Sequence, residues 1–154
     1  MMFRTHVAFG ILAGILALPF INPENPFLFI FLVAFASGLP DIDHPGSVMG
    51  RKVKIIGWIF DHRGFFHSLF AVALVAAGGF FLSKSMMVAA ALSVGYLSHL
   101  AGDALTHEGI APLTPLFRWR VHGFFSTGHL VEHLLFFVIV AAIIWVGITR
   151  FVFP

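Results

Sequence analysis

The stretch Phe136-Phe-Val-Ile-Val-Ala-Ala-Ile-Ile-Trp-Val-Gly-Ile148 decides the fold class, because no charged side chain interrupts it. It lies inside a longer apolar stretch, residues 127–153. A straight helix needs about 20 residues to cross the hydrocarbon core of a bilayer, with a range of about 17–25. The sequence therefore predicts a transmembrane helix in this region.

The composition of the whole chain supports the same conclusion. The 154 residues are 59% hydrophobic and 10% charged, and the mean hydropathy is +0.97. A soluble domain averages about 45–50% apolar and about 25% charged residues. This chain has too few charges to cover a water-facing surface, so we predict one integral membrane domain over residues 1–154.

Four further apolar stretches precede residues 127–153 in the chain, at residues 5–21, 26–40, 65–82 and 85–107. All except 26–40 are long enough to cross the bilayer. The short stretch could begin earlier, lie tilted, or end within the membrane. We predict an all-α, polytopic membrane bundle of about five helices.

Two other interpretations of the apolar stretches are weaker. The first stretch follows Arg4 and could be a signal peptide, but no small-x-small cleavage site follows it. A soluble bundle of buried helices is the second alternative, and the scarcity of charges argues against it.

Lysine and arginine residues predict the orientation of the helices, because cytoplasmic loops carry an excess of them. With the N-terminus in the cytoplasm, Lys84 and Arg150 lie outside and the other seven of the nine basic residues lie inside. These seven are Arg4, Arg51, Lys52, Lys54, Arg63, Arg118 and Arg120. Basic loops beside anionic lipid also explain a pI near 9.5, so we expect no nucleic-acid partner.

The nine histidines, which were not used to choose the orientation, all fall at or near the same predicted cytoplasmic end. Every Asp and Glu joins them except Glu24. Ionisable groups at bilayer depth are costly unless they pair or bind something. The chain has no cysteine, so His, Asp and Glu are the remaining metal ligands. We predict a metal site at one membrane face.

The strongest local motif is His99-Leu-Ala-Gly-Asp103. On a helix, positions i and i+4 share a face, so an imidazole and a carboxylate could reach one ion. His107 is one further turn along on roughly that face. A simple His–Asp hydrogen bond is the alternative for this pair taken alone.

A second motif, Pro40-Asp-Ile-Asp-His44, offers two carboxylates and an imidazole. The prolines at 40 and 45 favour an irregular backbone that can aim Asp41 and Asp43 at one point. A mixed set of this kind suits hard or borderline cations. A solvated turn with an aspartate helix cap is the alternative.

The segment Asp61-His-Arg-Gly-Phe-Phe-His-Ser68 places two histidines before the third stretch, and Gly64 could bend the chain so that both face inward. Its alternatives are an interfacial histidine pair and an N-terminal cap by Ser68.

The last stretch opens with His129-Leu-Val-Glu-His133, in which positions i, i+3 and i+4 share a helical face. Glu132 could instead orient a ligand imidazole. His6, alone near a helix start, is the weakest candidate by spacing.

These motifs together resemble the YdjM-type family of predicted membrane-bound metal-dependent hydrolases. The resemblance runs from His6 to about Pro115 and rests on four blocks in order. The blocks are Thr5-His6, Pro40-Asp-Ile-Asp-His44, His62-Arg-Gly-Phe-Phe-His-Ser68, and Gly95-Tyr-Leu-Ser-His-Leu-Ala-Gly-Asp103 with Thr106, Gly109 and Pro112. The resemblance implies an inner-membrane hydrolase whose functional positions are His6, Asp41, Asp43, His62, His67, His99 and Asp103.

A remoter similarity is to zinc-dependent phospholipase C and the P1-type nucleases, whose helical sites use His, Asp, His, His-x-x-x-Asp and His-x-x-x-Glu in chain order. The first four elements have counterparts in this chain. The last departs, because His129 is followed at the fourth position by His133, with Glu132 one residue early. The chain also starts Met1-Met2 where the secreted phospholipase has a tryptophan, so one or two ions are expected instead of three.

We therefore expect a membrane-embedded hydrolase that acts on a phosphoester, with a phospholipid as one candidate substrate, through metal-activated water at the cytoplasmic interface. The expected ion is Zn²⁺, with Mn²⁺ or Fe²⁺ as alternatives. The expected ligands are His6, Asp41, His62, His67, His99, Asp103 and His129. Asp43 or Glu132 is the expected general base, and Arg51, Lys52 and Arg63 are expected to bind phosphate.

Two other functions remain open from the sequence. Metal-ion or proton transport would need polar residues across the membrane, whereas the opposite halves of the stretches, such as 72–82, are almost purely apolar. The second alternative function is structural: a non-catalytic metal ion would hold the helices of the bundle together. The oligomeric state and the roles of His44, His107, His122 and His133 stay open.

Overall fold

A computed structural model of the chain describes residues 1–53, 55 and 63–151. Within these described residues there are five α-helices and three short 3-10 helices. In chain order these are α1 (Phe3–Ile21), α2 (Pro26–Ala36), η1 (Pro40–Asp43), η2 (Gly50–Lys52), η3 (Phe65–His67), α4 (Leu69–Ser83), α5 (Met86–Ala104) and α6 (Leu130–Phe151). The all-helical prediction is confirmed.

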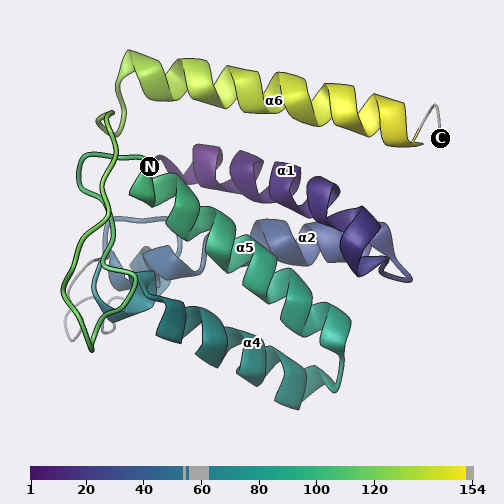
Figure 1. Cartoon of the computed structure of the whole chain (residues 1–154), viewed down its shortest axis with the longest axis horizontal. Helices are drawn as coiled ribbons and strands as arrows, with labels where there is room; N and C mark the ends of the chain where they lie inside the picture. Colours follow the sequence, from purple (N-terminus) through teal and green to yellow (C-terminus); the bar gives the residue numbers. More distant parts are fainter. Residues whose placement is uncertain (54, 56–62, 152–154) are drawn as a thin grey trace.

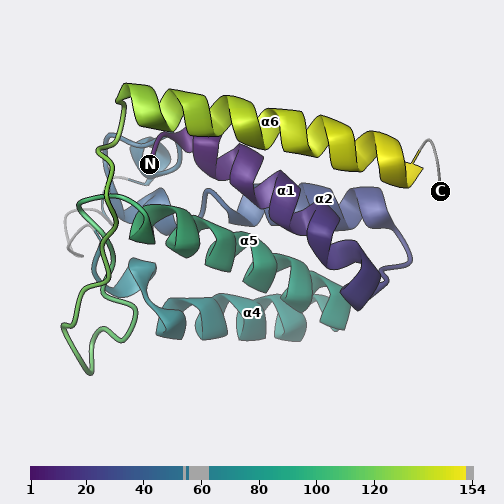
Figure 2. The same cartoon turned by 45° about the horizontal axis from the view of Figure 1, so that its top comes forward.

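The helices run alternately up and down the long axis of the molecule, as Figures 1 and 2 show. The N-terminus, the end of α5 and the start of α6 lie at one end, and the C-terminus lies at the other. Helix α5 packs against α1, α2 and α4, while α6 packs against α1. Helix α5 is therefore the central element of the bundle.

Polar side chains define where the helices begin. The Asn25 side chain accepts the Leu28 backbone N–H at 3.0 Å, directly before Pro26 at the first position of α2. Ser68 and Ser85 cap α4 and α5 in the same way. The cap role considered for Ser68 is thus confirmed, and it fixes the start of α4 directly after His67.

Three segments are long and apolar enough to cross a membrane by length and composition: Phe3–Ile21, Pro26–Asp43 and Leu130–Arg150. The expectation that the second stretch was too short was wrong, because η1 extends α2. The third stretch is shorter than expected, since its first residues form η3 and leave a helix of 15 residues, Leu69–Ser83. Helix α5 carries more polar residues, which the surrounding helices cover.

Two predicted boundaries are also corrected at the polar end. Helix α5 ends at Ala104, where the Thr106 hydroxyl donates to the Asp103 carbonyl at 2.8 Å. His107 therefore lies in the following loop, exposed, and does not continue the His99 face. Helix α6 begins at Leu130, so His129 precedes it.

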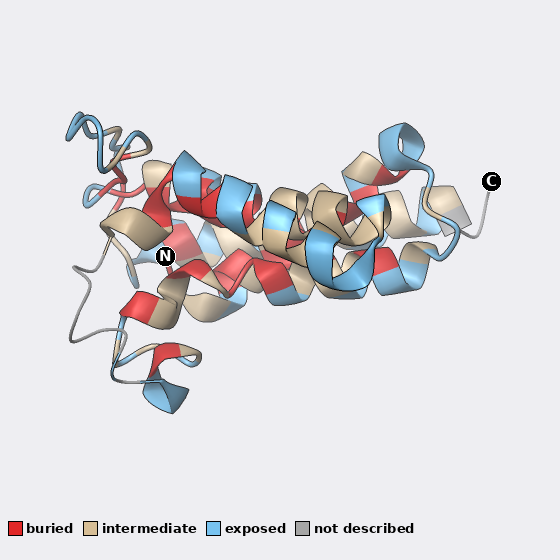
Figure 3. Cartoon of the chain, turned by 90° about the horizontal axis from the view of Figure 1, so that it is seen from below, coloured by how far each residue is buried: buried red, intermediate tan, exposed pale blue. Residues whose placement is uncertain are grey.

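The distribution of buried residues suits a lipid environment. Large apolar side chains cover the outer surface, such as Leu82 at 90% and Phe20 at 85% exposure. Buried segments gather toward the end with the N-terminus in Figure 3. Exposed apolar surface of this extent is rare on soluble monomers, so the outside of the bundle fits hydrocarbon.

Close helix packing depends on a glycine where α5 crosses α2. A Cβ added at Gly95 would lie 2.2 Å from the Val33 carbonyl oxygen and 2.7 Å from the Ala36 Cβ. Both neighbours belong to α2, so any side chain at position 95 must push the two helices apart.

We expect Gly95→Ala to lower the free energy of unfolding by about 1–3 kcal/mol through overpacking, although alanine is the better helix former. Thermal unfolding in detergent measures the effect. Gly78→Ala is the matched control, because nothing lies within 4 Å of a Cβ at Gly78 in α4. Equal stability of the two variants would contradict the close packing of α2 on α5.

Candidate metal centre

Four donor atoms from three separate segments converge at the polar end of the bundle. Asp41 comes from η1, His67 from η3, and His99 and Asp103 from one face of α5. The His67 and His99 Nε2 atoms lie 3.2 Å apart. From His67 Nε2, Asp103 Oδ2 lies at 3.5 Å and Asp41 Oδ1 at 3.9 Å, and from His99 Nε2 the same oxygens lie at 3.6 and 3.7 Å.

These five separations are close to those between two ligands of one small cation. Zinc bound at about 2.0–2.1 Å places tetrahedral ligand atoms about 3.3–3.4 Å apart, and the five separations measure 3.2–3.9 Å. Asp41 and Asp103 belong to two different donor groups, which share His99. Each group is therefore a candidate site for a divalent cation.

A hydrogen bond behind His99 and an ion pair behind His67 aim the two Nε2 atoms toward this region. His99 Nδ1 lies 2.8 Å from the Ser37 carbonyl oxygen, and a carbonyl can only accept, so Nδ1 carries the proton and Nε2 presents its lone pair. His67 Nδ1 lies 3.2 Å from Asp43 Oδ2 and is oriented in the same way. Histidine ligands are commonly held by such partners.

The cluster requires a positive charge at its centre. Two Nε2 lone pairs and two carboxylates would repel one another in an apolar surrounding unless a proton or a cation lies among them. Burial lowers the pKa of His67, but the carboxylates of Asp103 and Asp43 outweigh it and raise this pKa to about 9. A metal ion would displace that proton on binding.

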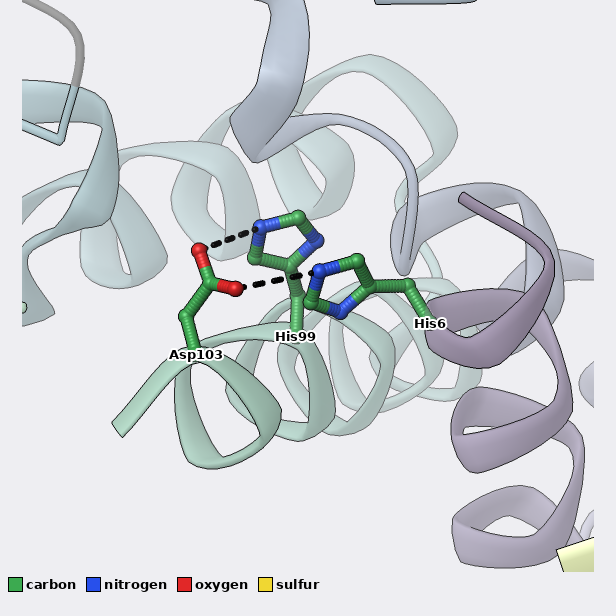
Figure 4. Close-up of side chains that lie close together, drawn as sticks. All are labelled: His6, His99 and Asp103. Carbon is green, nitrogen blue, oxygen red and sulfur yellow. Dashed lines mark ion pairs between the residues drawn. The ribbon is translucent and has the colours of Figure 1, made fainter. Parts of the chain in front are cut away.

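His6 adds a donor beside the first four. Its Nε2 lies 3.2 Å from Asp103 Oδ1, and its ring stacks on His99 with centroids 3.6 Å apart. Figure 4 shows the Asp103 carboxylate beside the two rings, with one oxygen toward each. Two overlapping donor groups result, His6 with His99 and Asp103, and Asp41 with His67 and His99. One or two ions fit this arrangement.

His6 is buried with unused hydrogen-bonding capacity. Its exposed fraction is 1%, and among the described residues its Nδ1 atom has no hydrogen-bond partner. The terminal amine of Met1 lies 2.6 Å from the same Asp103 Oδ1 that His6 approaches. An unpartnered buried imidazole nitrogen is costly, which supports a ligand at this position.

Arg63 lies between the cluster and the loop that follows α5. Its guanidinium lies 3.4 Å from Asp103 Oδ1 and 3.6 Å from Glu108 Oε2. It also donates to Thr106 Oγ1 at 3.2 Å and to the Gly109 carbonyl at 3.1 Å. Sequence reasoning named Arg63 but missed Thr106 and Glu108 as its partners, since only the fold brings them beside it.

The two predicted general bases have other contacts. Asp43 is buried against His67 and accepts the Arg63 backbone N–H at 3.2 Å. Glu132 accepts the Met2 N–H through Oε1 and the Gly128 N–H through Oε2, both at 2.6 Å, which joins the start of α6 to the start of α1. These contacts favour positioning roles for both carboxylates.

Other predicted site residues lie apart from the two donor groups. His129 is exposed and precedes α6, and Arg51 and Lys52 are exposed on η2. His62 falls outside the described residues. His44 and His122 are exposed, and His133 bonds through Nδ1 to the His129 carbonyl at 3.0 Å.

Comparisons with known proteins agree with this picture. The profile of the family described as "YdjM inner membrane protein" matches residues 1–153. The inner membrane protein YdjM of Escherichia coli is 44% identical over 96 residues, covering 53% of this chain and 46% of the relative. The protein YvsG of Bacillus subtilis is 33% identical over 141 residues, covering 86% and 85%.

The chain thus spans about half the length of the YdjM relatives it matches, which include one from Shigella flexneri. No solved structure matches the chain significantly.

We expect His99→Ala to lower metal affinity by more than about 100-fold, because even supporting residues around metal ligands contribute about 10–100-fold. Metal content after dialysis against graded chelator measures this. His122→Ala, an exposed histidine, is the control, and His129→Ala decides whether that predicted ligand takes part. Equal metal in His99→Ala and wild type would exclude the cluster.

We expect Asp43→Asn to weaken metal binding by about 10–100-fold, because the amide orients His67 less strongly than the carboxylate does. The protein should still bind metal at high concentration, unlike a variant that lacks a ligand. Calorimetric titration of apoprotein in detergent checks this, and an affinity equal to wild type would show that Asp43 does not position His67.

Proposed function

Because the chain belongs to the YdjM inner membrane protein family and gathers its buried His and Asp donors at one end of a membrane bundle, we propose that it is a membrane-embedded, metal-dependent hydrolase of phosphoesters. The single observation that carries the proposal is the convergence of Asp41, His67, His99 and Asp103, whose donor atoms lie 3.2–3.9 Å apart in five pairs. Two nitrogens and two oxygens suit Zn²⁺, with Mn²⁺ or Fe²⁺ as alternatives.

The charges around the cluster suit a reaction of an anionic substrate with water. A divalent ion, when bound, lowers the pKa of coordinated water and stabilises charge on phosphoryl oxygens. The Asp41 side chain is 13% exposed whereas His67, His99 and Asp103 are 0–1% exposed. Water and substrate therefore reach the cluster past Asp41.

Arg63 is the residue we propose to hold a substrate phosphate. Its guanidinium is already fixed by Thr106 and Gly109, so little side-chain entropy is lost when it binds an anion. Its contact with the exposed Glu108 is the one that a phosphate would replace most easily. Bidentate arginine–phosphate pairs are strong and directional.

The position of the cluster favours a substrate at the membrane surface. It lies at the ends of α1 and α5, where apolar helix surface gives way to loops. Lipid headgroups occupy this depth in a bilayer, and a lipid phosphoester would meet Arg63 there. The excess of basic residues at the same end supports the cytoplasmic face.

A structural metal is the second candidate function, because most of the donors are fully buried. Ions held by the two donor groups, which include His6, Asp41, His67 and Asp103, would join α1, η1, η3 and α5. Transport has less support, since every buried ionisable side chain in the described part of the chain lies at this one end.

We expect metal-loaded protein in nanodiscs to hydrolyse a chromogenic phosphodiester or a phospholipid headgroup ester. His99→Ala should reduce kcat/KM by more than about 100-fold, and Arg63→Gln should mainly raise KM. Steady-state rates over a range of substrate concentrations separate the two effects.

Metal bound in full, no turnover on any phosphoester, and a large loss of thermal stability on chelation would together reject the hydrolase and support the structural metal. Glu24→Gln, at the opposite end of the bundle, is the control for general effects of removing a charge.

A further inference from the structure

The loop between α5 and α6 contains a hairpin that the proposed reaction does not use. Ile110 and Val121 pair as an antiparallel bridge, with backbone N–H···O distances of 2.9 and 2.8 Å. Turns between these residues, with the Thr114 N–H bonded to the Ala111 carbonyl at 3.1 Å, form the tip. In Figure 2 this segment extends sideways past α4 at the end of the bundle.

The outer part of the hairpin exposes large apolar side chains and two arginines. Leu116, Phe117 and Trp119 are 69%, 63% and 65% exposed, and Arg118 and Arg120 are exposed between and after them. Aromatic side chains that alternate with arginines suit the interface of a bilayer, where rings lie at headgroup level and guanidinium groups reach lipid phosphates. In water the same patch would be unfavourable.

The contacts between the base of the hairpin and the start of α4 fix the position of the hairpin along the bundle axis. The Pro112 carbonyl accepts the Leu69 backbone N–H at 2.9 Å, and Ile110 packs with Ala71 and Val72 in the core. The hairpin is thus attached where α4 begins, at the end of an apolar helix. A segment that extends sideways from this level lies along the membrane surface instead of projecting into water.

We propose that residues 110–121 form an interfacial anchor that binds the anionic headgroup layer beside the bundle. Arg118 and Arg120 supply the complementary charge, and Leu116, Phe117 and Trp119 supply the apolar contact. The anchor is connected to the metal cluster, because Arg63 donates hydrogen bonds to Thr106 and Gly109, which directly precede residue 110. This inference does not depend on hydrolase activity.

The fluorescence of Trp119 tests the anchor directly. The chain has three tryptophans, and Trp58→Phe with Trp145→Phe leaves Trp119 as the only reporter. The full chain is reconstituted at low density into vesicles of phosphatidylcholine with or without phosphatidylglycerol. Emission and quenching are then measured with lipids brominated near the headgroup, lipids brominated deep in the chain, and aqueous iodide.

We expect blue-shifted Trp119 emission that headgroup-proximal bromine quenches more than deep bromine or iodide. Each arginine near an anionic surface contributes about fivefold to binding. Arg118→Gln with Arg120→Gln should therefore increase iodide access in vesicles that contain phosphatidylglycerol and change it little in pure phosphatidylcholine. A chain that retains only Trp145 on α6 serves as the control for contact with lipid chains.

Two results would overturn the anchor. Emission like that of tryptophan in water, quenched by iodide and not by brominated lipid, would mean that the hairpin projects into solvent. Protection that disappears when the protein is diluted in lipid would mean that a second copy of the chain covers the hairpin instead.

Discussion

The constraint on which the structure depends is that like charges and lone pairs cannot share a dry site without a cation. Asp41, His67, His99 and Asp103 direct two carboxylates and two imidazole nitrogens at one point, while lipid-facing helices surround them. The Arg63 guanidinium and the terminal amine of Met1 lie beside Asp103, and a proton or a metal ion among the four donors would supply further positive charge. The described part of the bundle therefore gathers its buried His, Asp and Glu side chains at one end.

Helix α5 is the element that brings the donor side chains together at one end of the bundle. It carries His99 and Asp103 one turn apart and packs against α1, α2 and α4. Gly95 lets the α2 backbone approach closely, and the Ser37 carbonyl that follows α2 then reaches His99. A packing contact between α2 and α5 thus helps to set the tautomer and direction of a site residue.

The loops at this end connect the donor cluster to the hairpin that we propose to lie at the bilayer surface. Arg63 links the cluster to Thr106 and Gly109, and these residues lead into the hairpin that carries Trp119. The candidate site and the proposed anchor are therefore linked through the hydrogen bonds of Arg63. A substrate drawn from the headgroup layer would encounter Arg63 before it reached the buried donors.

The sequence alone determined the membrane class and the helical fold, because charges are scarce and the apolar stretches have the length of transmembrane helices. It also determined that His6, Asp41, His67, His99 and Asp103 share one end, since the spans have fixed lengths.

Only the tertiary structure decided which of them meet. Local spacing put His107 on the His99 face and His129 at the site, but α5 ends at Ala104 and α6 begins at Leu130. Counting ligands gave Asp43 and Glu132 a base role, and only the fold shows that Asp43 accepts the Arg63 N–H and that Glu132 accepts the N–H groups of Met2 and Gly128. Contacts of this kind depend on how separate helices pack, which no local pattern records.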